Sequence, residues 1–479
     1  MNDMQKLNFG EISAESERAE NPKLITYGFI DINSVEERAV NGKEFLFLGY
    51  KGSGKSSIGE RIELICDESF DRIVNKISLD DFPYTPFSKI IKGDVEPEAK
   101  FPTAWSWILL IYVLESFEKD AGATYSDRTL FDQAIKEFRD LGISPGSSPA
   151  SIVRKSSKNN LSFKLPYNLV GYETGNGDVK SSDEIFNFVH ILKSIIGGIN
   201  SNSKHYLIID GLDEILSSRG SQYKSLYALM NEVSSLNNMF SKKAVPFKII
   251  LLCRTDLFEK TPGPNKNKIR QAHGIELDWF HDPNDPDNSL LMKAAYLRAK
   301  ISLGRDIDIF TEFFPKKIYE TPIKQYLLDM TRHTPRDFLQ LLNYIVRTTK
   351  NSRLTVENVK SGLRDYSIKY FYPEIHDELS GYADADEISH TIQAIGRVGK
   401  RDLSFKELFL EMKIDYDKIT ETRLSEICST LFNCSAIGNI SDVRGYTHYS
   451  FKFRNRLSTF TRSKRIMLHR GLWKAMNIV

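Results

Sequence analysis

Eight consecutive residues, Gly49–Ser56, combine three glycines with a lysine and a serine at a spacing that suits phosphate binding. The segment reads Gly-Tyr-Lys-Gly-Ser-Gly-Lys-Ser and fits the pattern G-x-x-x-x-G-K-[ST]. Its glycines let the backbone wrap closely around a triphosphate, so that successive N–H groups point at the oxygens. Lys55 can neutralise the β- and γ-phosphate oxygens, and the Ser56 hydroxyl can coordinate Mg²⁺. We therefore predict a nucleotide and Mg²⁺ site formed by Gly49, Lys51, Gly52, Ser53, Gly54, Lys55, Ser56 and Ser57.

A string of acidic residues, Asp210-Gly211-Leu212-Asp213-Glu214, follows an apolar run at residues 206–209. Asp210 would end a strand, where it could hold Mg²⁺ directly or through water. Asp213 or Glu214 could polarise a water molecule against the γ-phosphate, and the sequence leaves open which of the two does so. The alternative is an ordinary acidic turn after a strand.

Two arginines could also reach the phosphates. Arg254 ends a third apolar run, and the carboxyl end of a central strand is the usual ligand position in open α/β sheets. It could sense the γ-phosphate, or it could simply pair with Asp256. Arg336 lies in His333-Thr334-Pro335-Arg336-Asp337, near the start of an apolar helix that could bring it back over the nucleotide. An ion pair is again the alternative.

The expected elements place these residues around one sheet. Residues 44–48 form a short apolar run, followed by the glycine-rich loop and a helical stretch over 55–66. The runs at 206–209 and 249–253 are rich in β-branched residues, as in strands that are buried on both faces of a parallel sheet. The fold class is therefore α/β, with a P-loop NTPase core of parallel strands and a helical insertion at about 67–200.

Two further domains are expected after this core, which we assign to residues 1–280. A Pro-, Asn- and Asp-rich linker at 281–288 precedes helical periodicity over 289–370, so residues 281–380 should form a helical lid. Its last helix should start at the N-cap Thr355, with an interruption at Pro373. Residues 381–479 should form a winged-helix domain, because short helices precede two strands that flank a turn at 442–445.

The charge distribution gives this last domain a basic tail. Residues 443–479 carry nine Lys and Arg and no acid, whereas the whole chain has 65 basic and 63 acidic residues. Such a tail suits either an anionic partner or an acidic surface of the same protein. A nucleic-acid footprint would use the helix at 423–432 with Arg444, Lys452, Arg454 and Arg456. Docking within the chain as a latch and binding to a protein partner stay open.

Composition excludes several other classes. The 479 residues are 41% hydrophobic, which is typical of globular proteins. The longest apolar run, at 107–114, is far shorter than the roughly 20 residues that cross a bilayer, and the start of the chain lacks a signal-peptide core. The four cysteines form no close C-x-x-C pair, which disfavours zinc and redox sites. We expect a cytoplasmic protein with no membrane contact.

Taken together, residues 49–56, the string Asp210–Glu214 and Arg254 resemble the STAND branch of the AAA+ P-loop ATPases. The resemblance implies that Asp210 coordinates Mg²⁺, that Asp213 and Glu214 support ATP hydrolysis, and that Arg254 senses the γ-phosphate. Arg336 is similar to the lid arginine called sensor two. Two departures stand out: Lys55 and Asp210 are 155 residues apart, and residues 333–335 lack the glycine of the family's Gly-x-Pro motif.

The ends of the chain are similar to NACHT- and KAP-like NTPases of bacterial phage-defence and mobile loci, on the residues Asn8-Phe9-Gly10, Gly28-Phe29-Ile30 and 469–474. This implies an ATPase with bound ATP or ADP and Mg²⁺ that switches state, assembles into a homo-oligomer and acts through a separate effector protein in antiviral defence. An arginine-finger role would fall to Lys268 or Arg270. The alternative is a winged-helix nucleic-acid-binding protein in which ATP is structural.

Overall fold

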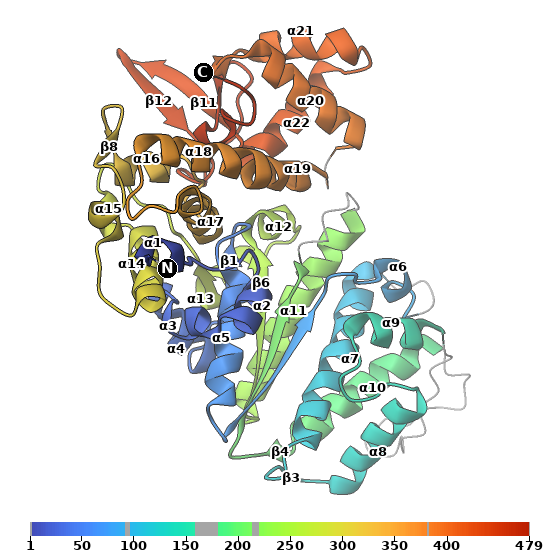
Figure 1. Ribbon diagram of the computed structural model, residues 1–479. Helices are drawn as coiled ribbons and strands as arrows, with labels where there is room; N and C mark the ends of the chain where they lie inside the picture. Colours follow the sequence, from blue (N-terminus) through green and yellow to red (C-terminus); the bar gives the residue numbers. More distant parts are fainter. Residues whose placement is uncertain (1, 92–95, 159–180, 213–219, 381–382, 479) are drawn as a thin grey trace.

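The computed structural model describes residues 2–91, 96–158, 181–212, 220–380 and 383–478 (Figure 1). Within these ranges the core is a five-stranded sheet of order β2-β5-β6-β1-β7, in which all neighbouring strands are parallel. The strands are β1 (Leu46–Gly49), β2 (Arg72–Ser78), β5 (Lys204–Asp210), β6 (Phe247–Arg254) and β7 (Gly274–Glu276). This confirms the predicted α/β class with a parallel P-loop sheet.

The strand register brings the chemically interesting residues to one edge of the sheet. Gly49 at the end of β1 is paired with Arg254 at the end of β6. In the same way Asp210, which ends β5, is paired with Ser78, which ends β2. Because the strands are parallel, their carboxyl ends meet at the same edge, and the glycine-rich loop starts there.

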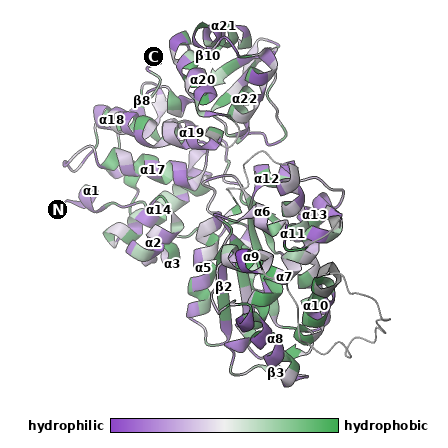
Figure 2. Ribbon diagram, turned by 90° about the vertical axis from the view of Figure 1, so that its right-hand side faces the viewer, coloured by the Kyte–Doolittle hydropathy of each residue, from purple (hydrophilic) through white to green (hydrophobic). Residues whose placement is uncertain are grey.

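Helices cover both faces of the sheet, and alternate strand residues face each layer. Phe47, Ile208 and Leu252 pack on one side with α5 (Lys55–Asp67) and α4 (Val35–Val40). Leu48, Ile209 and Leu251 pack on the other side with α7 (Pro97–Glu118) and α11 (Gly220–Lys242). Figure 2 shows hydrophobic residues gathered in these strands and in α7 beside them. The full burial of both faces explains why the runs at 206–209 and 249–253 do not alternate with polar residues.

The helical insertion lies between β2 and β5, so it starts later than the predicted residue 67: residues 72–78 form a strand of the sheet instead. Besides α7 it contains α6 (Tyr84–Phe87), α8 (Arg128–Asp140), α9 (Pro149–Lys158) and α10 (Ser181–Ile196), with a short ribbon of β3 (Thr124–Tyr125) and β4 (Ile199–Asn200). Helices α12 (Thr255–Lys260) and α13 (Lys266–His273) follow β6. The insertion shares one hydrophobic core with the sheet, which places it as a lobe of the sheet domain rather than as a separate body.

The lid region begins at α14 (Leu290–Leu303) and continues through α15 (Ile309–Glu312), the ribbon β8 (Lys317–Ile318) and β9 (Thr321–Pro322), α16 (Ile323–Asp329), α17 (Pro335–Val346) and α18 (Val356–Tyr366). Thr355 is the N-cap of α18, as predicted, and forms a capping box with Asn358. Pro373 does not end this helix. A π-helical segment, Ser367–Phe371, carries the chain directly into α19 (Tyr372–Ser380), where Pro373 occupies the second position.

The C-terminal region has the helices α20 (Ala385–Val398), α21 (Phe405–Asp415) and α22 (Glu421–Asn433), followed by an antiparallel sheet of order β10-β13-β11-β12. Its strands are β10 (Asp402–Leu403), β11 (Ile437–Val443), β12 (Tyr446–Ser450) and β13 (Arg465–Leu468). Both Arg444 and Gly445 in the hairpin turn have positive φ, of 51° and 81°. Such a pair is typical of a two-residue hairpin turn. Three helices and a protruding hairpin give the winged-helix arrangement (Figure 1).

The first residues of the chain lie outside the sheet domain. Helix α1 (Asp3–Lys6) and the residues after it place Met4, Leu7 and Phe9 in the same hydrophobic core as α14, α17 and the C-terminal domain. The chain then contacts α5 of the sheet domain through α2 (Ala14–Glu20), α3 (Pro22–Tyr27) and α4. The N-terminal segment therefore ties the lid to the sheet domain.

Candidate nucleotide-binding site

The glycine-rich loop has the backbone shape that a phosphate cradle requires. Gly52 and Gly54 have φ values of 78° and 91°, in the region that favours glycine. Lys55 is the first residue of α5, so the loop leads directly into a helix N-terminus. Backbone N–H groups at this position and the helix dipole both attract phosphate oxygens. The local geometry thus fits the phosphate chain of a nucleotide.

Lys55, Ser56 and Asp210 meet at the foot of this loop. The Lys55 ammonium donates hydrogen bonds to the carbonyls of Gly49 and Tyr50, at 3.1 and 3.2 Å. Asp210, only 9% exposed, accepts the backbone N–H of Gly211 at 2.9 Å and lies beside the Ser56 hydroxyl. Burial raises the pKa of the Asp210 carboxyl above its usual value, although the Ser56 hydrogen bond and the Lys55 charge oppose the shift. A hydroxyl beside a buried carboxylate is the oxygen pair that a Mg²⁺ site on a P-loop needs.

The lid contacts the loop directly. The backbone N–H of Arg336 donates to the carbonyl of Gly52 at 3.3 Å. A Cβ atom at Gly52 would lie 3.2 Å from the Cβ of Arg336, so the two segments touch. Thr334 caps α17 by accepting the N–H of Asp337, which fixes the start of the helix on the loop. The contact forms although residues 333–335 lack the glycine of the Gly-x-Pro motif.

These residues line a chamber that is open to solvent, with about 700 Å³ of space inside and at its mouth. It is lined by Lys51, Gly52, Gly54, Lys55, Ser56, Ser57 and Asp210 of the sheet domain, by Arg298, Pro335, Arg336 and Leu339 of the lid, and by Glu11, Ile12, Ser13, Ala14 and Glu17. Seven predicted nucleotide or metal residues and Arg336 therefore share one space. Gly49 and Ser53 belong to the same loop but do not line this chamber.

A second, apolar chamber of about 460 Å³ adjoins the first. Its side chains come from the segment after α3, from α4 and α5, from the residues after β7, and from the lid: Phe29, Ile30, Ile32, Val35, Ile58, Leu277, Trp279, Ala294 and Leu339. The two chambers share Gly54, Ser57, Arg298, Pro335 and Leu339. A polar chamber joined to an apolar one matches the two ends of a nucleotide, the phosphates and the base.

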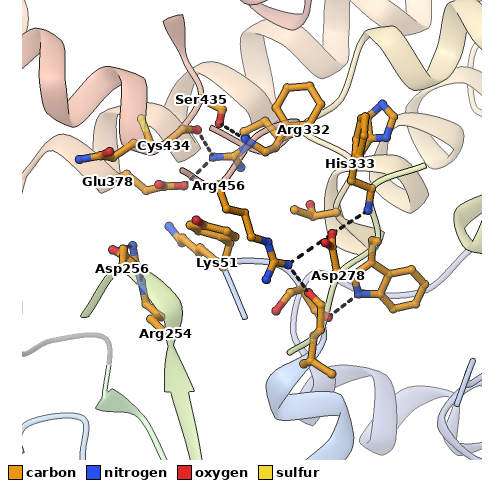
Figure 3. Close-up of a pocket in the computed structure, with 18 of the residues that line it drawn as sticks. Lys51, Arg254, Asp256, Asp278, Arg332, His333, Glu378, Cys434, Ser435 and Arg456 are labelled. Carbon is orange, nitrogen blue, oxygen red and sulfur yellow. Dashed lines mark hydrogen bonds and ion pairs between the residues drawn. The ribbon is translucent and has the colours of Figure 1, made fainter. Parts of the chain in front are cut away.

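Arg254 does not line the phosphate chamber but a third chamber of about 830 Å³, which shares Lys51 with it (Figure 3). Its guanidinium makes two hydrogen bonds to the Asp256 carboxylate, at 3.0 and 2.8 Å. Burial alone would raise the pKa of Asp256, but the Arg254 charge outweighs it and lowers that pKa. The structure thus places Arg254 in an ion pair with Asp256, the alternative that the sequence left open.

The remaining predicted site residues are not gathered at the loop. Asp213 and Glu214 lie outside the described residues. Lys268 is exposed on α13, and Arg270 on the same helix pairs with Glu276. Sequence reasoning missed Glu17 and Arg298, which line the phosphate chamber. One signal was available: Leu291, Ala295 and Arg298 follow helical spacing, which puts a charged residue on the apolar face of α14.

The basic residues of the C-terminal domain contact acidic groups of the same chain. Arg456 pairs with Glu276 and Asp278 and lies over the ring of Tyr50, and Arg454 and Arg470 both pair with Asp329. Arg423 on the candidate recognition helix pairs with Glu387. In the loop itself, Lys51 pairs with Glu374 of α19 at 3.1 Å. The C-terminal half of the molecule is therefore joined to the nucleotide loop by the pair Lys51–Glu374 and by the contact of Arg456 with Tyr50. Figure 3 shows Arg456 paired with Asp278 beside Lys51.

The hairpin tip is different, because it projects into solvent. Arg444 is exposed, and Tyr446 and Tyr449 are 74% and 48% exposed.

Within the described ranges, none of the helices combines the length and apolarity needed to cross a membrane.

Comparison with known proteins identifies one segment. A family model described as the FunZ-associated C-terminal helical domain matches residues 289–371, which run from the N-cap of α14 to the end of the π-helical segment. The comparison with curated proteins gives no match. The matched segment is the lid, and it covers too little of the chain to assign the whole protein to a family.

Solved structures show weak similarity over the whole length. One is Cdc6p from Pyrobaculum aerophilum, with 10% identity and a TM-score of 0.33 over 92% of this chain and 90% of that one. Another is Drosophila ORC bound to DNA, with 11% identity and a TM-score of 0.30 over 100% and 91%. At these scores the similarity carries no argument, and the fold class rests on the sheet order and the loop described above.

Proposed function

We propose that this protein binds and hydrolyses ATP and uses the bound nucleotide as a switch. The observation that carries the proposal is the placement of Lys55, Ser56 and the buried Asp210 in one chamber that Arg336 of the lid also lines. A bound Mg²⁺ ion would supply positive charge that offsets part of the negative charge of the phosphates. Ser56 and Asp210 would hold it, and Lys55 would leave its loop carbonyls to pair with the phosphates.

The choice of ATP follows from the apolar chamber. None of the side chains that line it is a carboxylate, which could read the donor groups of guanine, and its walls are aliphatic and aromatic. Hydrolysis needs a group that orients water, and we assign this role to Asp213 or Glu214, which follow Asp210 in sequence.

The switch would act through the lid and the winged-helix domain. Lys51 of the loop pairs with Glu374, and Arg456 covers Tyr50, so a change in the loop reaches both regions. This arrangement supports the latch within the chain that the basic tail suggested. We further propose that release of the latch leads to homo-oligomers and to contact with a separate effector in antiviral defence, with Lys268 or Arg270 as the arginine finger.

The decisive experiment is steady-state phosphate release from Mg·ATP together with nucleotide affinity. Lys55→Ala should weaken ATP binding, whereas Asp213→Ala or Glu214→Ala should leave ATP bound and unhydrolysed. Lys360→Ala, which removes a lysine from the surface of α18, is the matched control. Unchanged turnover in all three site variants would reject the assignment. Mass growth with a non-hydrolysable analogue, measured by light scattering, tests the oligomer.

A second candidate function is nucleic-acid binding with ATP as a structural ligand. The exposed hairpin favours it, because Arg444, Tyr446 and Tyr449 offer a cation and two aromatic rings to a nucleic-acid backbone or base. The pairing of Arg423, Arg454 and Arg456 inside the chain disfavours a larger footprint. Phosphate release that rises with duplex DNA, single-stranded DNA or RNA, and that falls again in Arg444→Ala, would support this function.

A further inference from the structure

Arg298 occupies an unusual position, at the junction of the two chambers. It lies on α14 and lines both the apolar chamber and the phosphate chamber. A nucleotide that placed its base in the first chamber and its phosphates in the second would have its ribose and α-phosphate at this junction. Of the residues common to both chambers, Gly54, Ser57, Arg298, Pro335 and Leu339, Arg298 carries the charge.

The Arg298 side chain is held in place by a built set of partners. Its two terminal nitrogens make hydrogen bonds to the Glu17 carboxylate at 2.7 and 2.8 Å, and one of them also donates to the carbonyl of Phe9 at 2.8 Å. The third nitrogen, Nε, is buried and has no hydrogen-bond partner among the described residues. A buried donor without a partner is unfavourable, so an acceptor supplied by a ligand at this point would be favoured.

The chain around this pair is shaped to accommodate it. Gly10 has a φ of 113°, and a Cβ there would lie 2.0 Å from an Arg298 nitrogen and 2.1 Å from a Glu17 oxygen. Asn343 of α17 accepts the N–H of Phe9 at 3.0 Å and donates to the carbonyl of Gly10 at 2.8 Å. The segment that carries Glu17 is therefore fixed to the lid, and glycine at position 10 leaves room for the ion pair.

Without its pair to Arg298, the Glu17 carboxylate would be unfavourable in this position. It lines the chamber that holds the phosphates, where a carboxylate repels the ligand. The bidentate pair with Arg298 neutralises that charge, and the side chain of Glu17 is only 5% exposed. A carboxylate at this position makes sense as the group that holds the guanidinium toward the ligand.

We propose that Arg298 is a nucleotide-binding residue that contacts the α-phosphate, and that Glu17 positions it. This inference rests on the proposed function. Arg298 then closes the lid on ATP and ADP alike, because both carry an α-phosphate, whereas Arg336 lies over the loop end of the chamber and responds to the terminal phosphate. Through Arg298, α14 would contact either nucleotide, whereas α17 would distinguish ATP from ADP through Arg336.

The test compares the affinities of ATP, ADP, AMP and adenosine for the full chain, by displacement of a fluorescent ATP analogue. Arg298→Gln should weaken ATP, ADP and AMP by a similar factor, about tenfold for a lost hydrogen bond to a charged group. The affinity for adenosine, which has no phosphate, should equal that of the unmodified protein. Glu17→Gln keeps an oxygen acceptor for Arg298 but removes the negative charge, so it should bind the three phosphorylated ligands at least as tightly as the unmodified protein.

If the ion pair between Arg298 and Glu17 only stabilises the fold, the ligand affinities change differently. Arg298→Gln and Glu17→Gln would then weaken all four ligands together, and this result would overturn the inference. Unchanged affinities in Arg298→Gln, or a loss confined to ATP, would overturn it as well. If Arg298→Gln does not fold, Arg298→Lys retains the charge but not the fork, and an equal intermediate loss for the three nucleotides is expected. Absence of ATP binding in the unmodified protein would instead reject the proposed function.

Discussion

At the scale of single residues, the lid contact depends on a glycine. Gly52 has a φ of 78°, and a Cβ there would lie 3.2 Å from both the Arg336 Cβ and the Thr334 Oγ1. Gly304, at the end of α14, has a φ of 69°, but a Cβ added there would meet open space. The two glycines therefore differ in what surrounds them rather than in backbone conformation.

We predict that Gly52→Ala and Gly304→Ala each lower the free energy of unfolding by about 1 kcal/mol, the cost of a side chain in the left-handed region. Only Gly52→Ala should also weaken ATP binding, by roughly tenfold, which corresponds to about 1.4 kcal/mol for the displaced lid. Calorimetric titration with ATP, next to denaturant unfolding, separates the two effects. Equal ATP affinities in the two variants would show that the contact between Gly52 and Arg336 does not matter for binding.

Two buried histidines should make the protein sensitive to acid. Burial lowers the pKa of His333 and of His469 to about 3, with the charges of Arg454 and Arg332 respectively as the next contributions. The ring of His469 accepts the N–H of Gly471 and faces the Thr331 carbonyl, which suits a neutral imidazole. The ring of His333 stacks on Phe453 and lies beside Phe280.

Because both folded pKa values lie below the ordinary value of 6.5, the unfolded chain takes up protons first as the pH falls. Stability is fully present above pH 6.5 and decreases toward pH 3. At pH 5 the loss is about 2 kcal/mol for each histidine. Urea unfolding at pH 7.5 and pH 5 should show this difference, and His333→Phe should remove about half of it. An identical pH dependence in His333→Phe would contradict the assignment.

At the scale of elements, the local signals in the sequence predicted most of the sheet and the loop. Apolar runs of β-branched residues marked β5 and β6, and the G-x-x-x-x-G-K-[ST] pattern marked both the end of β1 and the start of α5. The helix ends were predicted where a side chain caps them, as at Thr355. Pro373 misled the prediction, because a proline near the start of a helix needs no N–H partner, and the π-helical segment lets the chain continue.

The candidate site was predictable only where its residues follow a strand or a motif. Lys55, Ser56 and Asp210 do so, and the structure brings them together. Arg254 follows a strand too, yet its neighbour Asp256 holds it, and a pattern of residue types does not predict which carboxylate an arginine selects. Glu17 and Arg298 are 281 positions apart, so only the fold makes them a pair.

An ion cluster joins three helices behind the loop. Arg332 makes hydrogen bonds to Asp337 of α17, to Glu378 of α19 and to the carbonyl of Cys434, which follows α22. Arg332 and Glu378 are 6% exposed, and Asp337 is fully buried. Loss of the arginine would leave two buried carboxylates without their cation.

We predict that Arg332→Met lowers the free energy of unfolding by about 3–5 kcal/mol, since removing one partner of a buried pair leaves uncompensated charge. The control is Arg397→Met, which removes the partly exposed pairs with Glu411 and Asp415 and should cost about 1 kcal/mol or less. Denaturant unfolding at pH 7.5 measures both values. Similar losses of unfolding free energy in the two variants would mean that the buried cluster stabilises the protein no more than a partly exposed set of ion pairs does.

At the scale of the whole molecule, the predicted boundary at residues 380 and 381 does not separate two cores. Lid residues such as Phe338 and Phe371 share one hydrophobic cluster with Ile388 and Leu431 of the winged-helix domain and with Phe9 near the N-terminus. Hydrophobic periodicity indicates that a face is buried, but it does not indicate which element covers that face. The shared core of the lid and the winged-helix domain therefore could not be predicted from the sequence. The sheet domain thus meets one composite body across the nucleotide loop.

That interface offers a direct test of the latch. Arg456 crosses it, because it pairs with Glu276 and Asp278 of the sheet domain and lies 5.7 Å from the centre of the Tyr50 ring. Arg465 is the matched control, since it pairs with Asp402 and Asp442 inside the winged-helix domain. Both arginines belong to the winged-helix domain and have two acidic partners, but only Arg456 pairs outside that domain and contacts the loop.

We predict that Arg456→Gln speeds the release of a fluorescent ADP analogue by about fivefold to tenfold, equivalent to about 1–1.4 kcal/mol of lost interface energy, whereas Arg465→Gln leaves the rate unchanged. Reciprocity requires that nucleotide in turn affects the interface, so small-angle scattering of Arg456→Gln should show a larger radius of gyration with ATP than with ADP. Equal release rates in the two variants would place the switch elsewhere. A faster rate in Arg456→Gln alone ties the winged-helix domain to the phosphate loop through one side chain.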